Sequence, residues 1–413
     1  MTTLFKNIQQ LVGVHETTSI LRGKALAHLP VIQDAFLLVE DGIIVAFGHM
    51  HELDIVVPNQ PINIVDVTGQ FVLPAWCDSH THLVFAKSRE GEFVDKLNGK
   101  SYADIAANGG GILHSAKVLA DTSEEALYQL AKGRLQEVAQ MGTGAIEIKS
   151  GYGLSLDAEL KMLRVIKRLQ QTSDLIIKST FLGAHAFPMA FKEDHDGYIN
   201  SIIEEMLPVI AAEKLADYVD VFCENGFFSV KEMQRICEAA KQFGLKPKLH
   251  VNQLNSIGAL QAGIELGAVS LDHLETMTEA DITALAASNS IGTLLPTAAF
   301  FLRMAYQPAR KMIDAGAAIA IASDFNPGSS PSANMNFVVA LSCIQMKMLP
   351  QEAINAATIN GAFAMEVAHE VGSIAVGKKA NLIFTKPIPS LAYIPYSFGT
   401  NLIDKIMING IFI

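Results

Sequence analysis

Short apolar runs alternate with amphipathic stretches through the middle of the chain, from residue 71 to residue 324. One amphipathic stretch, residues 123–142, carries apolar side chains near helical spacing and ends at Gly142, a residue type that often stops a helix. Apolar runs that alternate with helical stretches are typical of βα units and of a parallel sheet. The pattern therefore predicts strands that are connected by helices.

Eight of the apolar runs have the length of buried strands. They are residues 71–82, 144–151, 176–185, 217–224, 246–252, 268–273, 291–296 and 317–324. Eight strands that alternate with helices suggest a (β/α)8 barrel of the TIM type, which is an α/β fold. We therefore expect residues 71–370 to form one barrel domain.

The two ends of the chain show another pattern, in which short β-type runs follow one another with turns between them. Asp41-Gly42 separates two apolar stretches and is a hairpin signal. Similar short runs return after residue 371. We predict that residues 1–70 join residues 371–413 in a small β-sandwich-like domain.

A glycine-rich segment, NGGGILHSA, occupies residues 108–116. It neither follows a strong strand nor matches a phosphate-loop motif. We therefore expect a mobile loop there and no nucleotide site.

Composition narrows the function classes. Half of the 413 residues are apolar and 18% are charged, which suits a compact enzyme. The formal net charge is -11 without a basic cluster, so we expect no nucleic-acid partner. The start of the chain lacks signal-peptide features and no apolar span reaches membrane length, so we expect a cytoplasmic protein without membrane contact. The four cysteines are scattered, which argues against disulfides and thiolate metal sites.

Ionisable side chains stand at the ends of the predicted strands. His80 and His82 lie two positions apart, so on a strand they point the same way and can bind one ion together. Further strand ends carry His185, Glu224, His250, His273 and Asp324. One histidine after an apolar run can be core packing, but repetition at six strand ends predicts a site, because these ends converge in a barrel.

His80, His82 and His250 with the carboxylate of Asp324 would form a metal site. Nitrogen and oxygen ligands of this kind suit zinc or iron and leave one position for water. Such an ion would lower the pKa of that water toward neutrality and make it a nucleophile.

Seven motifs along nearly the whole chain carry a resemblance to a known family. They are LPAWCDSHTHLVFAKSRE, IEIKSGYGL, TFLGAHAFP, LHVNQL, LDHLE, ASDFNPGSSPS and GSIAVGKKANLI. With them the chain resembles the amidohydrolase superfamily of metal-dependent hydrolases. Within it, the chain is most similar to the enzymes that hydrolyse 4-imidazolone-5-propanoate to N-formimidoyl-L-glutamate in histidine degradation. The resemblance implies hydrolysis of a C–N bond in a cyclic amide, one Zn²⁺ or Fe³⁺ per subunit, a small-molecule substrate and a homodimer.

The resemblance also implies roles for individual residues. The metal ligands would be His80, His82, His250 and Asp324. The substrate contacts would be Arg89, Tyr152, His185, Gln253, Asn326, Gly328 and Ser329. The catalytic residues would be Asp324, His273 and Gln253.

These roles agree with the chemistry of the side chains. The planar fork of Arg89 can hold a propionate by two hydrogen bonds, and Tyr152 can add its hydroxyl. Asp324 can accept the water proton and deliver it to the departing ring nitrogen, while His273 can stabilise the oxyanion or orient the water. Related deaminases have a glutamate at the position of Gln253, so an amide there implies orientation more than proton transfer.

Two departures from the superfamily pattern are present. Asn381 stands in the last motif where aspartate is usual, and it belongs to the terminal β unit. Lys149 ends the second predicted strand without the companions of a carbamylated lysine that bridges two ions. A site for one metal ion is therefore preferred.

Other interpretations remain open at the level of the sequence. Arg89 could be a surface ion-pair residue, and His185 could be a core histidine. Asn326, Gly328 and Ser329 could simply form a turn. For the whole chain, one alternative is a deaminase of an aminated heterocycle such as guanine or cytosine, which would release ammonia. Another is a barrel without chemistry that serves as an assembly scaffold.

Overall fold

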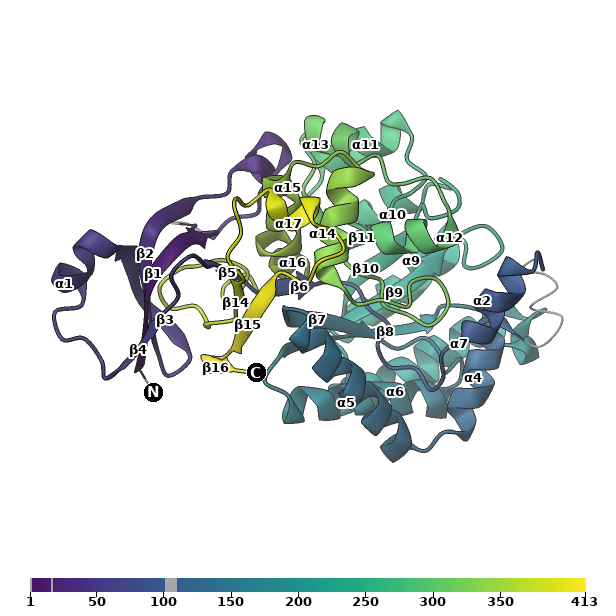
Figure 1. Ribbon diagram of the computed structural model, residues 1–413. Helices are drawn as coiled ribbons and strands as arrows, with labels where there is room; N and C mark the ends of the chain where they lie inside the picture. Colours follow the sequence, from purple (N-terminus) through teal and green to yellow (C-terminus); the bar gives the residue numbers. More distant parts are fainter. Residues whose placement is uncertain (1, 16–17, 101–109) are drawn as a thin grey trace.

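The computed structural model describes residues 2–15, 18–100 and 110–413, and it contains two large β-sheets (Figure 1). One sheet runs in the order β13-β12-β11-β10-β9-β8-β7-β6, with parallel pairing between all neighbours. Its strands are β6 (Trp76–Asp78), β7 (Thr143–Lys149), β8 (Ile176–Ala184), β9 (Tyr218–Cys223), β10 (Lys246–Val251), β11 (Ser270–His273), β12 (Ile291–Leu294) and β13 (Ile319–Ile321). Each predicted apolar run overlaps one of these strands, and the predicted (β/α)8 barrel is confirmed.

Helices lie around the barrel strands (Figure 1). They are α2 (Glu90–Leu97), α4 (Gly111–Asp121), α5 (Glu124–Gln140), α6 (Leu156–Thr172), α7 (His195–Asn200), α8 (Leu207–Glu213), α9 (Val230–Gln242), α10 (Ala259–Glu265), α11 (Glu279–Ala287), α12 (Pro296–Leu302), α13 (Ala309–Asp314), α14 (Met335–Ile344), α15 (Pro350–Ala357) and α16 (Ile359–Ala364). Local sequence determines where the helix α5 begins: Ser123 caps its start by accepting a hydrogen bond from the N–H of Ala126. No helix in the described part of the chain is both long and apolar enough to span a membrane.

The end of the first strand, β6, and the segments that follow β6 and β13 meet and close the barrel. The carboxylate of Asp78 accepts hydrogen bonds from the N–H and the hydroxyl of Ser323, at 2.9 and 2.5 Å. The N–H of Asp324 donates to the carbonyl of His80 at 3.0 Å, and the N–H of His82 donates to the carbonyl of Phe325 at 2.8 Å. The seam of the barrel is therefore formed by the two segments that carry three of the predicted metal ligands.

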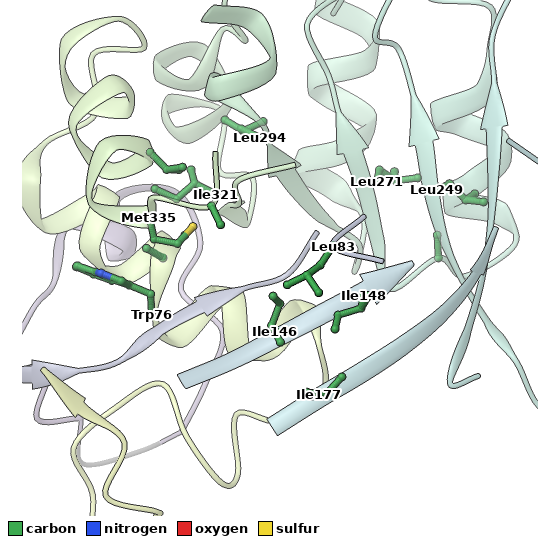
Figure 2. Packing of buried hydrophobic residues seen from close by; sticks show 14 of the residues in the cluster. Trp76, Leu83, Ile146, Ile148, Ile177, Leu249, Leu271, Leu294, Ile321 and Met335 are labelled. Carbon is green, nitrogen blue, oxygen red and sulfur yellow. The ribbon is translucent and has the colours of Figure 1, made fainter. Parts of the chain in front are cut away.

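The barrel strands send apolar side chains outward and charged ones inward. Ile146 and Ile148 of β7 belong to the large apolar cluster, as do Leu249, Leu271 and Leu294 from later strands (Figure 2). Glu147 and Lys149 alternate with these isoleucines and are fully buried. Because Lys149 contacts Asp220 on β9, a strand that is not its neighbour, this second face lies inside the barrel.

The second sheet, called the terminal sheet, joins the two ends of the chain. It contains β1 (Thr2–Val12), β2 (Val31–Glu40), β3 (Ile43–His49), β4 (Asn63–Asp66), β5 (Phe71–Pro74), β14 (Leu382–Thr385), β15 (Ile403–Ile408) and β16 (Ile411–Phe412). The predicted hairpin is confirmed, because Asp41 and Gly42 connect β2 to β3 with φ angles of 48° and 83°. The division into residues 1–70 with 371–413 and residues 71–370 stays a proposal.

Two sequence-based expectations need correction. Residues 71–82 are not one strand, because β5 pairs with β1 and β14 in the terminal sheet and β6 begins the barrel only at Trp76. An apolar run cannot show where the chain changes its pairing partner. The loop expected at residues 108–116 is wrong from residue 111 onward, where α4 begins; residues 108 and 109 lie outside the described part. The N–H of Gly111 donates to the side chain of Glu92 at 2.8 Å, a tertiary contact that anchors this helix start.

Candidate active site

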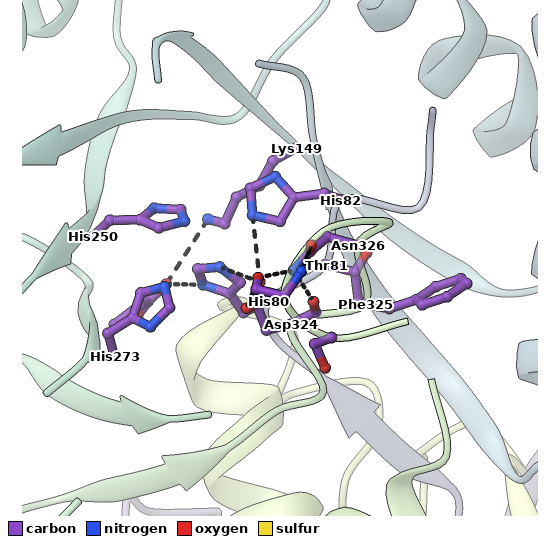
Figure 3. Close-up of polar contacts among 12 residues, drawn as sticks. His80, Thr81, His82, Lys149, His250, His273, Asp324, Phe325 and Asn326 are labelled. Carbon is purple, nitrogen blue, oxygen red and sulfur yellow. Dashed lines mark hydrogen bonds and ion pairs between the residues drawn. The ribbon is translucent and has the colours of Figure 1, made fainter. Parts of the chain in front are cut away.

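The ends of the barrel strands bring the predicted metal ligands together (Figure 3). Ring nitrogens of His80, His82 and His250 lie within 4.8 Å of one another, and His80, His273 and Asp324 form a second group of the same size. The carboxylate oxygen Oδ1 of Asp324 lies 3.6 Å from Nε2 of His80 and 3.5 Å from Nε2 of His82. The fold therefore gathers all four predicted ligands around one space.

The protonation of these histidines fits metal binding. Burial lowers the pKa of His80 and of His82 well below the ordinary value, so both rings are neutral. Nδ1 of His80 donates to Asp272 at 2.7 Å, and Nδ1 of His250 donates to Asp220 at 2.7 Å. The Nε2 atoms then carry the lone pairs.

One nitrogen of this group marks the site most clearly. Nε2 of His80 is fully buried and has no hydrogen-bond partner among the described residues. Buried polar atoms of this kind are rare unless they bind a ligand. The residues therefore fit a transition-metal ion, and the donor set suits zinc or iron.

Two of the residues at the site have strained backbones. The φ angles of His273 and Asp324 are 86° and 52°, in the left-handed region that residues other than glycine rarely adopt. Such conformations cost free energy and are concentrated at functional sites. Here His273 is the last residue of β11, and Asp324 lies in the segment that follows β13.

Sequence reasoning missed the carboxylates that orient the histidines. Asp220 and Asp272 lie within β9 and β11 and are at most 1% exposed. Lys149 lies beside both, with Nζ 2.9 Å from Oδ2 of Asp220 and 3.8 Å from Oδ2 of Asp272. The carboxylates surrounding Lys149 raise its pKa above the ordinary value despite its burial. The available signal was a charged residue within an otherwise apolar buried strand.

A cavity of about 460 Å³ extends from the metal ligands toward the surface. Its walls include all of the predicted substrate contacts, which are Arg89, Tyr152, His185, Gln253, Asn326, Gly328 and Ser329. Further walls come from Lys96, Ile112, Phe222, Phe227, Leu254 and Leu302. A cavity of this size with a few convergent polar groups is typical of a small-molecule site.

Arg89 is both a cavity wall and an ion-pair residue. Its Nη2 lies 2.6 Å from Oε2 of Glu92, and its Nε donates to the same oxygen at 2.9 Å. Glu92 also receives the N–H of Gly111, so it holds the guanidinium against α4. Gly328 provides room, because a Cβ at that position would overlap the guanidinium of Arg89.

His185 offers an acceptor to the cavity. The carbonyl oxygen of Gly151 lies 3.0 Å from Nδ1 of His185, so Nδ1 carries the proton and Nε2 the lone pair. Burial lowers the pKa of His185 to about 3, which keeps the ring neutral. The ring stacks on that of His82, with centroids 5.4 Å apart. Burial also raises the pKa of Tyr152, so its phenol stays a hydrogen-bond donor.

The segment after Asp324 is held by its own turn. Oδ1 of Asn326 accepts the N–H groups of Gly328 and Ser329, each at 2.8 Å, and its Nδ2 donates to the carbonyl of Asp324 at 2.7 Å. These residues therefore do form a turn, and the turn places Oγ of Ser329 3.5 Å from the Asp324 carboxylate.

Glu224 lies at another strand end and supports the turn that follows β10. Its carboxylate accepts the N–H groups of Leu254 and Asn255, at 2.9 and 3.0 Å. These contacts hold the turn that carries Gln253, and Gln253 reaches the cavity wall. The structure thus places Glu224 behind the site and Gln253 in it.

His273 and Asp324 lie close together at the inner end of the cavity. Burial lowers the pKa of His273, but the charge of Glu275 and its contact with Nδ1 at 3.3 Å outweigh it and raise the pKa to about 9. Burial raises the pKa of Asp324 to about 7, against the attraction of His273. Without a bound ion, the ring of His273 is therefore mostly protonated near neutral pH, and the carboxyl group of Asp324 can exchange its proton there.

Asn381 is remote from this chemistry. Its Nδ2 donates to the carbonyl of Gly144 at the start of β7, and its Oδ1 accepts the N–H of Asn409. The residue thus connects the barrel to the terminal sheet.

A (β/α)8 barrel with histidines and an aspartate gathered at its strand ends defines a class of metal-dependent hydrolases, and comparison with known proteins agrees. The chain matches the amidohydrolase family over residues 71–412 and belongs to that family.

Curated relatives place the chain within the family. It is 57% identical to the imidazolonepropionase of Flavobacterium johnsoniae, over 99% of both chains. It is 54% identical to the imidazolonepropionase of Christiangramia forsetii, again over 99% of both, and 42% identical to that of Parabacteroides distasonis, over 98% and 97% of the two chains. The predicted resemblance is therefore confirmed.

Solved structures share the fold at low identity. Guanine deaminase from E. coli superposes with a TM-score of 0.75 at 13% identity, covering 100% of this chain and 99% of that one. An adenosine deaminase from Xanthomonas campestris with bound zinc gives a TM-score of 0.70 at 17% identity, covering 99% and 92%. These likenesses support the barrel architecture.

Proposed function

We propose that this protein hydrolyses 4-imidazolone-5-propanoate to N-formimidoyl-L-glutamate, a step of histidine degradation. The observation that carries the proposal is a single cavity with a cation, Arg89, in its wall and the histidines and Asp324 at its inner end. The substrate has a propionate at one end and a hydrolysable ring at the other. The similarity to imidazolonepropionases over nearly the full chain supports the same assignment.

The centre would hold one Zn²⁺ or Fe³⁺ per subunit through His80, His82, His250 and Asp324. When bound there, the ion would supply Lewis acidity, which makes a water molecule a nucleophile at neutral pH. The lone pairs on Nε2 of His80 and His250 prepare the site for it, because no proton must be removed from these atoms first.

The cavity wall would bind and orient the substrate. Arg89 would donate hydrogen bonds to the propionate, and the phenol of Tyr152 would add one more. His185, with its lone pair on Nε2, would accept a hydrogen bond from a ring N–H. Gln253 can both donate and accept, so it would orient the heterocycle. These contacts would place the carbonyl carbon of the ring beside the catalytic groups.

Asp324 and His273 would carry the proton transfers. As water adds to the ring carbonyl, the Asp324 carboxylate would take up one proton from it. The protonated ring of His273 would donate a hydrogen bond to the oxyanion that develops on the carbonyl oxygen. The C–N bond then breaks, and Asp324 would return the proton to the departing nitrogen.

A direct assay tests this proposal. Purified protein of known metal content is mixed with 4-imidazolone-5-propanoate, and the ultraviolet absorbance of the substrate is followed. Decay of the signal, abolished by His250→Ala, is expected. A stable signal with wild-type protein would contradict the proposal. Ammonia release from guanine or cytosine would favour a deaminase instead, and absence of both bound metal and hydrolysis would favour a scaffold.

We also propose that the protein acts as a cytoplasmic homodimer without a nucleic-acid partner. All four cysteines are free, which suits a reducing compartment, and the net charge of -11 opposes phosphate backbones. Sedimentation velocity tests the oligomeric state, and a monomer at micromolar concentration would contradict the dimer.

A further inference from the structure

Lys149 lies inside the barrel at the end of β7 and is fully buried (Figure 3). Its Nζ lies 2.8 Å from Oε1 of Glu147, 2.9 Å from Oδ2 of Asp220 and 3.8 Å from Oδ2 of Asp272. A buried ammonium costs several kcal/mol in desolvation unless it is well paired. The three carboxylates around Lys149 therefore offset the cost of burying its charge.

Two of these carboxylates hold metal-ligand histidines by the same oxygens. Oδ2 of Asp220 accepts the hydrogen bond from Nδ1 of His250 at 2.7 Å, and Oδ2 of Asp272 accepts that from Nδ1 of His80 at 2.7 Å. Lys149 thus stands at the middle of a continuous path from His80 to His250. The path joins four strands, β7, β9, β10 and β11, to the segment after β6.

We propose that Lys149 is a positioning residue that fixes His80 and His250 through Asp272 and Asp220 and thereby strengthens metal binding. The inference rests on the proposed function only in that the four ligands hold an ion. It assigns to Lys149 no contact with the substrate. The ammonium of Lys149 forms ion pairs with Glu147 and Asp220, so Lys149 would remain a cation beside the metal ion and would not bind it.

Lys149 could affect metal affinity in two opposite ways, so the sign of the change in affinity distinguishes them. A positive charge near the centre repels a metal cation, so a lysine that acted only through its charge would weaken binding. Its removal would then tighten binding. If Lys149 acts by holding the carboxylates in place, its removal instead lets both histidines turn, and binding weakens. Removal of supporting partners of metal ligands typically costs 10–100-fold in affinity.

The barrel contains a matched control. Lys248 on β10 is also fully buried, but its Nζ donates to the hydroxyl of Ser270 at 2.7 Å and the carbonyl of Ala364 at 3.0 Å. Within the described residues it forms no ion pair with Asp220 or Asp272. Replacement of Lys248 removes a buried ammonium from the same interior without touching the path to the ligands.

The experiment compares three variants, which are Lys149→Met, Glu147→Gln with Lys149→Met, and Lys248→Met. The double variant keeps the net charge of the interior, because it removes one carboxylate together with the ammonium. Metal-free protein is titrated with Zn²⁺ against a chelator, without substrate, so the result does not depend on which reaction is catalysed. The visible absorption spectrum of Co²⁺-loaded protein reports the ligand geometry, and circular dichroism checks folding.

We expect both Lys149 variants to bind Zn²⁺ about 10–100-fold more weakly than wild type and to change the Co²⁺ spectrum, while Lys248→Met keeps the wild-type affinity and spectrum. Unchanged or tighter binding in a folded Lys149 variant would overturn the proposal. Equal weakening in Lys248→Met would overturn it too, because the effect would then follow from any lost lysine. If both Lys149 variants fail to fold while Lys248→Met folds, Lys149 is needed for the fold itself, and a role in positioning alone is excluded.

Discussion

The terminal sheet and the interior of the barrel bury different chemistry. In the terminal sheet the buried cluster is apolar, and it includes Phe5, Leu37, Val72 and Phe384. In the barrel interior the buried groups are charged, and Glu147, Lys149, Asp220, Lys248 and Asp272 are each at most 1% exposed. Both regions are built from β-strands, so secondary structure does not explain the difference.

The two regions contribute differently to stability and to function. Apolar burial stabilises a fold without further conditions, whereas buried charges stabilise it only when they are paired. The barrel keeps its charges and the strained backbone of His273 because its helices supply apolar packing on the outer face of the strands. We therefore expect changes in the barrel interior to affect chemistry most, and changes in the terminal sheet to affect folding most.

The largest effect is expected from Asp324→Asn. The amide cannot accept the water proton, so kcat/KM should fall by about 10⁴-fold. The free energy of unfolding of the metal-free protein should stay unchanged or rise, because burial disfavours the ionised carboxyl group. Steady-state kinetics and denaturant unfolding measure the two quantities.

The exposed Asp174→Asn is the control for this variant and should behave like wild type. A large loss of stability in Asp324→Asn would contradict the expected difference between the two regions, since it would show that the site also stabilises the fold.

For Phe384→Ala in the terminal sheet we expect lower stability and unchanged activity. Phe384 is fully buried and its ring contacts those of Phe5 and Phe412. The cavity left by the ring should lower the free energy of unfolding by about 3–5 kcal/mol. The kcat of the folded fraction should not change. Phe398→Ala, at a residue 61% exposed, is the matched control and should have little effect on unfolding.

A change in the cavity wall is expected to affect substrate binding. Arg89→Met removes the cation proposed for the propionate, so KM should rise about 10–100-fold, as expected for the loss of charge-assisted hydrogen bonds. Arg89→Lys should lie between, because an ammonium lacks the planar fork. Initial rates over a range of substrate concentrations give these values.

Glu92→Gln separates the two interpretations of Arg89. It removes the negative charge beside Arg89 but keeps an amide oxygen that can accept a hydrogen bond from the guanidinium, so KM should stay near the wild-type value. If Glu92→Gln and Arg89→Met raised KM equally, Arg89 would act only as an ion-pair residue.

The smallest effect is expected from Thr385→Val. The hydroxyl of Thr385 accepts the N–H of Phe71 at 3.0 Å, which joins β14 to β5 in the terminal sheet. The variant leaves this buried N–H without an acceptor and should lower the free energy of unfolding by about 1–2 kcal/mol, with unchanged kcat. Thr283→Val on the exposed face of α11 should change it by less than about 0.5 kcal/mol.

Much of the fold was predictable because buried parallel strands are locally apolar. All eight barrel strands overlap predicted runs, and the hairpin at Asp41-Gly42 follows from residues that accept positive φ angles. The change of sheet after Pro74 was not predictable, since β5 and β6 differ in their partners and not in their local pattern. The start of α4 at Gly111 depends on Glu92, which is 19 residues away in sequence.

Some features of the candidate site were likewise predictable from local sequence, and others were not. The spacing of His80 and His82 and the repeated polar residues at strand ends are local features, and they predict the ligand candidates. The pairing of Asp272 with His80 and of Asp220 with His250 joins residues 192 and 30 positions apart, and no local pattern records such pairs. Arg89 could be assigned to a surface or to a cavity from sequence, and it lies in a cavity wall while paired with Glu92.

By itself, the sequence determined which segments become strands and helices and which chemical groups stand at the strand ends, because periodicity and side-chain chemistry are local properties. Only the tertiary structure decided which nitrogen of each histidine faces the common space and which lysine stands behind the ligands. These features depend on distances between strands that are remote in sequence, and closure of the barrel is what brings those strands together.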